Sequence, residues 1–195
     1  MIDVSRETAR ALAQYCELVR KWNPRINLVA AGSLLEFEER HLRDSLQLVD
    51  LSAKTNTNWV DLGSGGGLPG LVVAISRPDL EVKLIESDRR KAEFLRTVCR
   101  ELGLKNCAIV AQRIEAVDRL DVANISARAL AALPLLMSYV SRHLAEDGTA
   151  WLMKGRNWHA EVEEARKTWR FDLISHPSLT DENAAILEIR RIEHV

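Results

Sequence analysis

The segment WVDLGSGGGLPG, residues Trp59–Gly70, is the most informative part of this sequence. It joins an apolar run that ends in Asp61 to a second apolar run, LVVAI, at positions 71–75. Glycine fills four of the five positions 63–67, and glycine both adopts positive φ and lets a ligand approach bare backbone. Pro69 suits the first turn of a helix, where its missing N–H costs nothing. The segment therefore predicts a strand, a ligand-binding turn and a helix.

Strand-like and helix-like segments alternate from Asn58 onward. Helices are expected over 70–76, 88–104, 130–144 and 158–169, and strands over 58–62, 81–86, 107–111, 121–126, 148–154, 171–179 and 184–191. This alternation is typical of an α/β fold with a mostly parallel sheet of seven strands, covered by helices on both faces. The last two strands have no helix between them, which predicts a terminal hairpin with one antiparallel strand.

The first part of the chain, residues 1–55, has the spacing of a helical extension to one domain that spans 1–195. A first helix is expected from the cap Ser5 to a break at Pro24. A second is expected to open with a capping box, Ser33–Glu36, and to run to about Val49. Its inward positions are predicted to be Leu35, Leu42, Leu46 and Val49.

Composition sets further bounds. A net charge of −1 argues against a protein that coats nucleic acid by bulk charge, but it leaves room for a local basic face. No run of apolar residues is long enough to predict a membrane span. The three cysteines, Cys16, Cys99 and Cys107, have no CxxC spacing, which favours thiols in a reducing cytoplasm over a disulfide framework or a metal site.

Two ligands fit the glycine-rich turn. Gly65, Gly67 and Gly70 match the dinucleotide fingerprint GxGxxG, whereas Asp61 followed by Gly63, Gly65 and Gly67 matches an S-adenosylmethionine loop. A carboxylate at the strand end would repel a pyrophosphate but suits a ligand that carries a sulfonium. The second interpretation is therefore favoured, with Asp61, Gly63 and Gly65 as cofactor-binding residues.

Two later strand ends extend the predicted site. Glu86 follows the second strand, where an acidic side chain accepts hydrogen bonds from ribose hydroxyls in either kind of nucleotide fold. Ile114 and Glu115 follow the third strand, where an apolar side chain covers adenine and a polar group contacts its exocyclic amine. These positions predict a nucleoside lying across the carboxyl ends of the strands.

Seven motifs in a fixed order give a resemblance to a known family. They are WNPRINL (22–28), RHLRDS (40–45), DLGSGGGLPG (61–70), ESDRRKAEFLR (86–96), RIEAVD (113–118), ISARALAAL (125–133) and LMKG (152–155). Together they resemble the bacterial 16S rRNA (guanine-N7) methyltransferase G family, also called glucose-inhibited division protein B. Gly66 stands where many members carry Pro, which affects only the rigidity of the loop.

The resemblance implies a class I, Rossmann-like methyltransferase fold with a helical N-terminal segment and S-adenosylmethionine as cofactor. It implies that Gly63 and Leu68 touch the cofactor, that Ile114 and Glu115 hold its adenine, and that Arg128 lines the cofactor and catalytic pocket. It also implies methyl transfer to N7 of a guanine in 16S rRNA. N7 carries a lone pair and no proton, so no general base is required, and Arg128 is expected to orient the base near O6.

Partners follow from that resemblance: 16S rRNA or the small ribosomal subunit, met by a cytoplasmic monomer. The phosphate-binding candidates are Arg25, Arg43, Arg89, Arg90, Lys91, Lys154 and Arg156, with Arg40, His41 and Arg96 as further possibilities. His41 is expected to serve packing. Most tryptophans are expected in the core or at edges, with Trp158 the best candidate for stacking on a base.

Other functions remain open on the residues alone. An NAD-dependent oxidoreductase would need a Tyr-x-x-x-Lys pair or a His-Asp dyad, and neither Tyr15 nor Tyr139 is followed by Lys at that spacing. An RNA-binding module without catalysis would not need Asp61, Gly63, Gly65 and Glu86. A methyltransferase for a small molecule stays possible, because fold does not determine substrate.

Overall fold

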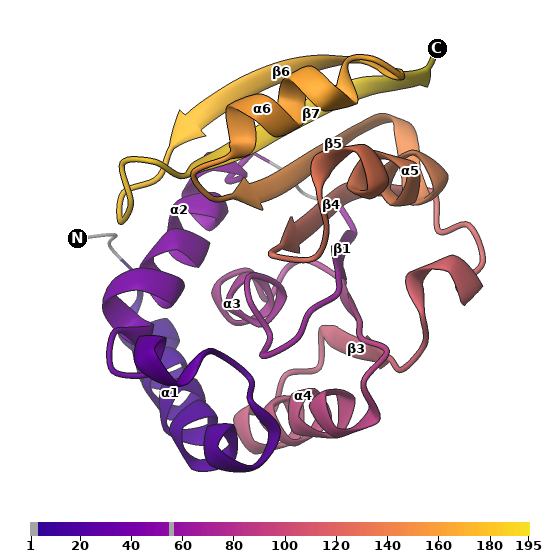
Figure 1. Cartoon of the computed structure of the whole chain (residues 1–195). Coiled ribbons are helices and arrows are strands. Elements are labelled where there is room, and N and C mark those ends of the chain that lie inside the picture. The colour runs from indigo at the N-terminus through magenta and orange to yellow at the C-terminus, as the bar shows by residue number, and fades with distance from the viewer. Residues whose placement is uncertain (1–3, 55–56) are drawn as a thin grey trace.

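The computed structural model describes residues 4–54 and 57–195 (Figure 1). Its helices are α1 (Arg6–Ile26), η1 (Ala31–Ser33), η2 (Phe37–Leu42), α2 (Arg43–Leu51), α3 (Gly70–Ser76), α4 (Arg89–Leu102), η3 (Ile114–Ala116), α5 (Leu133–His143) and α6 (Trp158–Ala165). Its strands are β1 (Trp59–Leu62), β2 (Val82–Ile85), β3 (Cys107–Val110), β4 (Val122–Arg128), β5 (Leu144–Lys154), β6 (Trp169–Pro177) and β7 (Ala185–His194).

The strands form one seven-stranded sheet in the order β3-β2-β1-β4-β5-β7-β6. Strands β1 to β5 pair in parallel, and β7 pairs antiparallel with both β5 and β6. The predicted α/β fold and its terminal hairpin are therefore confirmed. Because β1 to β5 run in one direction, the segments that follow them all emerge at one edge of the sheet.

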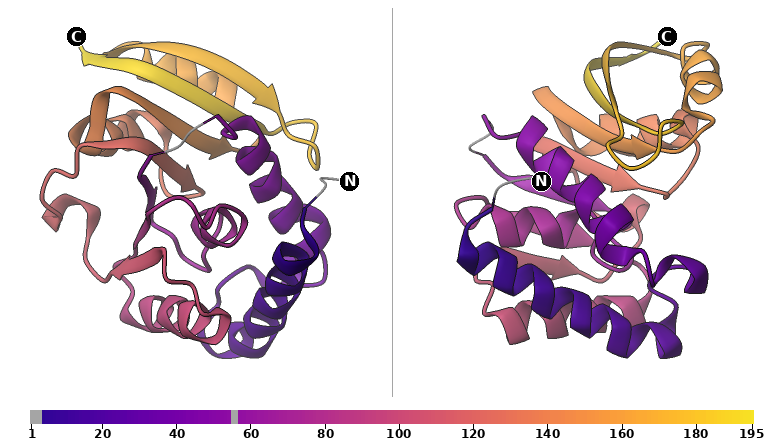
Figure 2. Two further views of the ribbon diagram at one scale, coloured as in Figure 1. Left: turned by 180° about the vertical axis from the view of Figure 1, so that it is seen from behind. Right: turned by 90° about the vertical axis from the view of Figure 1, so that its left-hand side faces the viewer.

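Helices cover both faces of the sheet, as Figures 1 and 2 show. Successive side chains of a strand point to opposite faces. Trp59 accordingly belongs to the core under α1, α2, α3 and α4, while Val60 belongs to the core under α5 and α6. The two apolar layers cover the faces of the sheet, so a site can form only where its strands end.

The N-terminal segment departs from the prediction at Pro24, which does not break α1. The helix continues to Ile26, and Asn27 closes it in the left-handed region with φ 48°, where its N–H donates to the carbonyl of Asn23. The buried Asn23 side chain in turn accepts a hydrogen bond from the backbone N–H of Val29. These asparagine contacts, rather than the proline, set the end of the helix.

The second helix also begins later than predicted. Ser33 does not cap it, because the Ser33 hydroxyl donates to the carbonyl of Ala30 at 2.9 Å. Leu35, predicted to point inward, is 95% exposed, so that prediction is wrong. The chain instead winds into the π-helix η2 and becomes α-helical only at Arg43. A π-helix is an irregular turn that proteins often place at functional sites.

The remaining sequence bounds concern thiols and membranes. Cys16 is buried, Cys99 and Cys107 are half-buried, and all three are free thiols. Within 4–54 and 57–195, no helix is both long enough and apolar enough to cross a membrane.

Candidate active site

The glycine-rich turn between β1 and α3 forms the floor of the site. Gly63, Gly65 and Gly67 have φ values of +65°, +54° and +97°, a region that residues with a Cβ rarely adopt. Gly70 has a different task, since a Cβ there would lie 2.6 Å from the Cβ of Asp61. The glycines thus shape an open turn and let α3 pack directly on β1.

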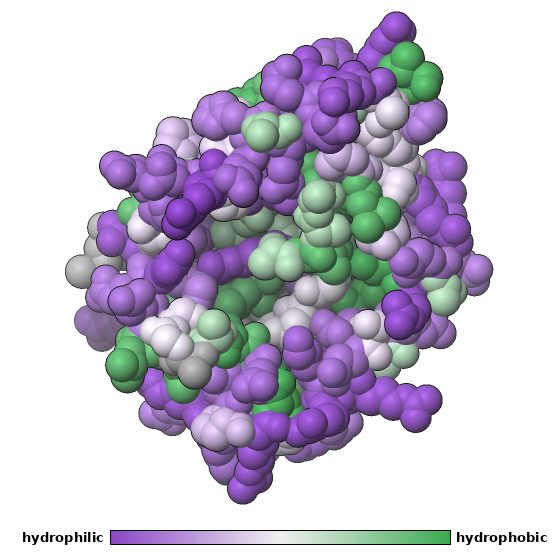
Figure 3. Space-filling model, in the orientation of Figure 1, coloured by the Kyte–Doolittle hydropathy of each residue, from purple (hydrophilic) through white to green (hydrophobic). Residues whose placement is uncertain are grey.

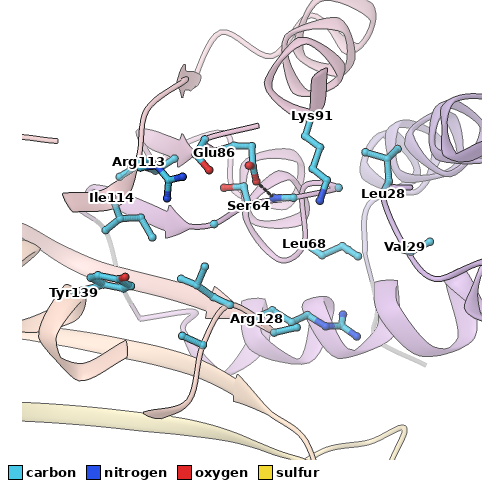
Figure 4. Close-up of a pocket in the computed structure, with 18 of the residues that line it drawn as sticks. Leu28, Val29, Ser64, Leu68, Glu86, Lys91, Arg113, Ile114, Arg128 and Tyr139 are labelled. Atoms are coloured by element: carbon cyan, nitrogen blue, oxygen red, sulfur yellow. Dashed lines mark hydrogen bonds between the residues drawn. The ribbon is translucent and has the colours of Figure 1, made fainter. Parts of the chain in front are cut away.

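Hydrogen bonds from two other elements fix this turn. The Tyr15 hydroxyl, from α1, donates to the carbonyl of Gly66 at 2.7 Å. The backbone N–H of Gly65 donates to Oε2 of Glu86 at 2.7 Å (Figure 4). The other carboxylate oxygen of Glu86 accepts from the backbone N–H of Asp88, also at 2.7 Å. Glu86 therefore couples the turn after β1 to the turn after β2.

A cavity of about 590 Å³ opens above the turn. Its volume falls in the range of about 300–1,000 Å³ that is usual for sites of small ligands. Figure 3 shows a hollow on this face of the molecule, with both hydrophobic and hydrophilic residues on its walls. Of the predicted cofactor residues, the cavity is lined by Gly63, Gly65, Leu68, Glu86, Ile114, Glu115 and Arg128.

One end of the cavity is built by η3 and positioned by α5. The Tyr139 hydroxyl donates to Oε1 of Glu115 at 2.7 Å, and this hydrogen bond holds the pKa of the Glu115 carboxyl below its usual range. Nε2 of the buried His143 lies 3.2 Å from the carbonyl of Ile114. Figure 4 shows Ile114 and Tyr139 at this end and Leu28 and Val29 at the other. Tyr139 was not among the predicted site residues, because its helical spacing resembles that of any core residue.

Asp61 is the predicted cofactor residue that the structure places elsewhere. Side chains alternate along β1, so Asp61 points under the turn toward α3 and does not line the cavity. There Trp59 Nε1 donates to the hydroxyl of Ser126 at 2.8 Å, and that hydroxyl donates to Asp61 Oδ1 at 2.6 Å. Burial raises the pKa of Asp61 to about 6. Asp61 therefore supports the turn from below.

Arg128 is the last residue of β4, as expected, and its side chain is 17% exposed. Its Nη1 donates to the backbone carbonyl of His41 at 3.2 Å, and its Nη2 contacts Nδ1 of the same residue. Nη2 also lies 3.8 Å from Oδ2 of Asp44. These contacts of Arg128 come from η2 and α2, whereas Asp61 bonds to Ser126 and Glu115 bonds to Tyr139.

His41 lines the cavity from η2, although its expected role was packing and it was only a further possibility for phosphate binding. Burial first, and then the Arg128 guanidinium, lowers the pKa of His41 to about 4, so the imidazole is neutral at pH 7. A guanidinium has only donors, so Nδ1 must accept and the proton belongs on Nε2. The N-terminal segment thus contributes a neutral imidazole to the site.

A second cavity, of about 320 Å³, adjoins the first and shares Arg128 and Ala129 with it. Three basic side chains, Arg40, Arg128 and Lys154, and three acidic ones, Asp44, Glu161 and Asp181, line it. Its other walls come from β5, β7 and the connection between β6 and β7. Arg128 therefore stands on the wall between two adjoining spaces.

The predicted phosphate-binding residues fall into two groups. Arg25, Arg43, Arg89, Arg90 and Arg156 are exposed, and Lys91 is half-buried and points into the first cavity (Figure 4). The side chain of Lys154, in contrast, is only 9% exposed. It lies 2.6 Å from Oε2 of Glu161 and donates to the carbonyl of Ala131 at 2.8 Å. Lys154 is thus a structural ion-pair partner, because β5 carries it inward against α6.

The tryptophans largely follow the prediction. Trp59 and Trp151 are buried, and each indole N–H donates to a side chain of β4. Trp22 is half-buried and packs against Phe94. Trp158 is half-buried and stacks on His159 with ring centroids 3.4 Å apart, so one face of its indole is already occupied.

This arrangement, with a glycine turn, an acidic residue after β2 and an apolar end, agrees with comparisons against known proteins. The family model of rRNA small subunit methyltransferase G (GidB) matches residues 8–189. The chain belongs to this family. It is 60% identical to the ribosomal RNA small subunit methyltransferase G of Paracoccus denitrificans over 99% of this chain and 100% of that protein. The protein of the same name from Ruegeria sp. strain TM1040 is 46% identical over 100% of this chain and 96% of its own length.

Solved structures show the same fold at low identity. A mutant of MtNAS in complex with S-adenosylmethionine superposes with a TM-score of 0.66 at 16% identity, over 94% of this chain and 75% of that chain. A putative S-adenosylmethionine-dependent methyltransferase of Methanococcus maripaludis has a TM-score of 0.63 at 10% identity, over 97% and 95%. This GidB-family chain thus has the class I methyltransferase fold, and its cofactor is S-adenosylmethionine.

The residues of the first cavity fit that cofactor. Each oxygen of the Glu86 carboxylate accepts one backbone N–H, and a carboxylate has about four acceptor sites, so acceptors remain for ribose hydroxyls. Ile114 provides an apolar wall for a base and is 7% exposed. A Cβ at Gly63 would lie 2.5 Å from Leu130 Cδ1, so only glycine lets the Leu130 side chain pack this closely against the turn. The GidB-family site therefore suits the nucleoside part of this cofactor.

Proposed function

We propose that this protein transfers the methyl group of S-adenosylmethionine to N7 of a guanine in 16S rRNA, without a general base. The observation that carries the proposal is the position of Arg128 on the wall common to both cavities. The names of the family and of its relatives support small-subunit rRNA as the substrate.

The chemistry of N7 supports the absence of a base. N7 and O6 are both acceptors on one edge of guanine, and N7 has no proton to lose before attack. A guanidinium donor beside O6 orients the ring while leaving the N7 lone pair free. When bound, the cofactor supplies an electrophilic methyl group on sulfur. The protein supplies orientation, which contributes roughly 7–11 kcal/mol in favourable cases.

Exposed basic residues at the carboxyl edge support the contact with RNA. Arg89 and Arg90 begin α4 directly after the Glu86 turn, and Arg90 Nη2 donates to the carbonyl of Arg25 at the end of α1. Arg43 begins α2, and Arg156 follows β5. Phosphate contacts of this kind position an RNA without reading its sequence. We expect the protein to act in the cytoplasm as a monomer on 16S rRNA or on the small ribosomal subunit.

The test is a methyl-transfer assay with labelled S-adenosylmethionine. The substrates are small subunits and naked 16S rRNA from cells that lack this activity, and fully modified subunits serve as the control. Nuclease digestion and mass spectrometry then identify the modified nucleoside. We expect 7-methylguanosine at one position, and label in another nucleoside or in protein only would refute the proposal.

A further inference from the structure

The second cavity contains an ion pair with unused hydrogen-bonding capacity. Asp44 is buried in α2, and its Oδ1 accepts from the hydroxyls of Ser178 at 2.8 Å and Thr180 at 2.6 Å. These two bonds fix the carboxylate from the connection between β6 and β7. Its Oδ2 lies 3.8 Å from Arg128 Nη2, which is beyond hydrogen-bonding distance. Asp44 and Arg128 therefore lie side by side on the cavity wall, and neither uses up the hydrogen-bonding capacity of the other.

Arg128 retains donors as well. A guanidinium has five N–H donors, and the two contacts with His41 occupy two of them. On the cavity wall, a fixed donor thus stands next to a fixed acceptor. Guanine carries the complementary order along one edge, with the acceptor O6 on the ring carbon next to the donor N1–H.

We propose that the second cavity receives the target base and that Arg128 and Asp44 together select guanine, with Arg128 donating to O6 and Asp44 Oδ2 accepting from N1–H. This inference rests on the proposed function. N7 lies on the opposite side of O6 from N1, so a base held in this way leaves N7 toward the cofactor cavity, whose wall Arg128 shares. One residue pair then fixes both the identity and the orientation of the base.

The same pair disfavours adenine. Adenine presents an amino donor at position 6 and a bare acceptor at N1, which is the reverse order. The guanidinium would face a donor and the carboxylate would face an acceptor, so both would stay unpaired in a buried site. Leaving buried polar groups unpaired is a strong source of discrimination between substrates.

The experiment changes the base and the carboxylate together. Once the methylated position is mapped, ligated 16S rRNA is prepared with guanine, inosine or 2-aminopurine at that position and assembled into small subunits. Inosine keeps O6 and N1–H, whereas 2-aminopurine lacks both and keeps N7. With the unmodified enzyme, we expect inosine to react within about 3-fold of guanine and 2-aminopurine to lose about 10- to 100-fold in kcat/KM.

The variant Asp44→Asn keeps an oxygen for Ser178 and Thr180 but loses the carboxylate. We expect it to lower kcat/KM for guanine by about 10- to 100-fold while hardly changing the rate with 2-aminopurine, so that discrimination collapses. Asp50→Asn, at an exposed position of the same helix, is the matched control. Affinity for S-adenosylmethionine, measured by calorimetry, should stay unchanged in both.

The outcomes separate this inference from the proposed function. If the unmodified enzyme makes no 7-methylguanosine, the proposed function fails. If it does, but accepts 2-aminopurine as well as guanine, the reading of O6 and N1 is wrong, and this result needs no variant. An equal loss for guanine and 2-aminopurine in Asp44→Asn would mean that Asp44 serves only structure, which also overturns the inference.

Discussion

Arg128, at the end of β4, makes two contacts with His41 of η2: one to its backbone carbonyl and one to its imidazole. The two residues are 87 positions apart in the chain. The N-terminal segment therefore completes the active site instead of only covering the sheet. A substitution in η2 is therefore expected to alter the position of the Arg128 guanidinium directly.

The neutrality of His41 has a consequence for stability. Its folded pKa, about 4, lies below the ordinary 6.5, so the unfolded chain takes up a proton first as the pH falls. The stabilisation is present above about pH 6.5 and disappears toward pH 4. Lowering the pH from 7.5 to 5 should therefore reduce the contribution of His41 to the free energy of unfolding by about 1–2 kcal/mol, with allowance for the partial exposure of its side chain.

The measurement is urea unfolding at these two pH values. His41→Gln should lose less stability on acidification than the unmodified protein. His159→Gln, at an exposed position, should behave like the unmodified protein. The comparison is made between variants because Asp61, whose pKa is raised to about 6, changes stability in the opposite direction. Parallel losses in all three proteins would contradict a neutral His41.

Gly63 offers a sharp test of the cofactor turn. Gly63→Asp places a Cβ 2.5 Å from Leu130 Cδ1 and a negative charge in the cavity, so we expect affinity for S-adenosylmethionine to fall at least about 100-fold. Gly103→Asp is the control, because Gly103 has nearly the same φ, +66°, with nothing within 4 Å of its Cβ. Both variants carry similar backbone strain, so calorimetry separates strain from cavity filling. Equal losses would refute the assignment of the turn.

The sheet could be predicted from the sequence because its signals are local. Gly63, Gly65 and Gly67 lie in one turn, and the alternation of strands and helices fixes the carboxyl edge where Glu86 and Ile114 emerge. The predictions failed where a distant partner decides. Pro24 lies within α1, which ends at contacts of Asn23 instead. Leu35 is exposed, and Ser33 bonds to Ala30 instead of capping a helix.

The predictions for the site also succeeded where the signal was local and failed where a distant partner decides. Which residues follow each strand can be read from the chain, but which way a side chain points cannot. Asp61 turns toward α3, and Lys154 turns toward Glu161. His41 and Tyr139 line the cavity only because the fold brings η2 and α5 beside the carboxyl ends of the strands. No spacing in the sequence brings these elements together.

Arg90 is exposed and does not line either cavity, so we expect it to act in RNA binding separately from the cofactor. Arg90→Glu should weaken binding to 16S rRNA and reduce the salt slope of the binding constant by about 1, because a phosphate contact is lost. Cofactor affinity should stay nearly unchanged. Arg100→Glu, near the other end of α4, is the matched control. An equal loss of RNA and cofactor binding in Arg90→Glu would assign the residue to structure.

Lys154, unlike Arg90, is expected to contribute to stability and not to RNA binding. Its ammonium lies 2.6 Å from Oε2 of Glu161, and only 9% of its side chain is exposed. Lys154→Met keeps the apolar stem but leaves Glu161 without its cation. We expect a loss of about 2–3 kcal/mol in the free energy of unfolding, somewhat below the figure for a fully buried pair because Glu161 is partly exposed. Arg156→Met, at an exposed position two residues on, should leave stability nearly unchanged.

RNA binding should show the opposite ranking of these two variants. The salt slope of the binding constant should fall in Arg156→Met and stay constant in folded Lys154→Met, because only the exposed cation can release counterions from phosphate. A reduced salt slope in Lys154→Met without a loss of stability would return Lys154 to the RNA-binding surface.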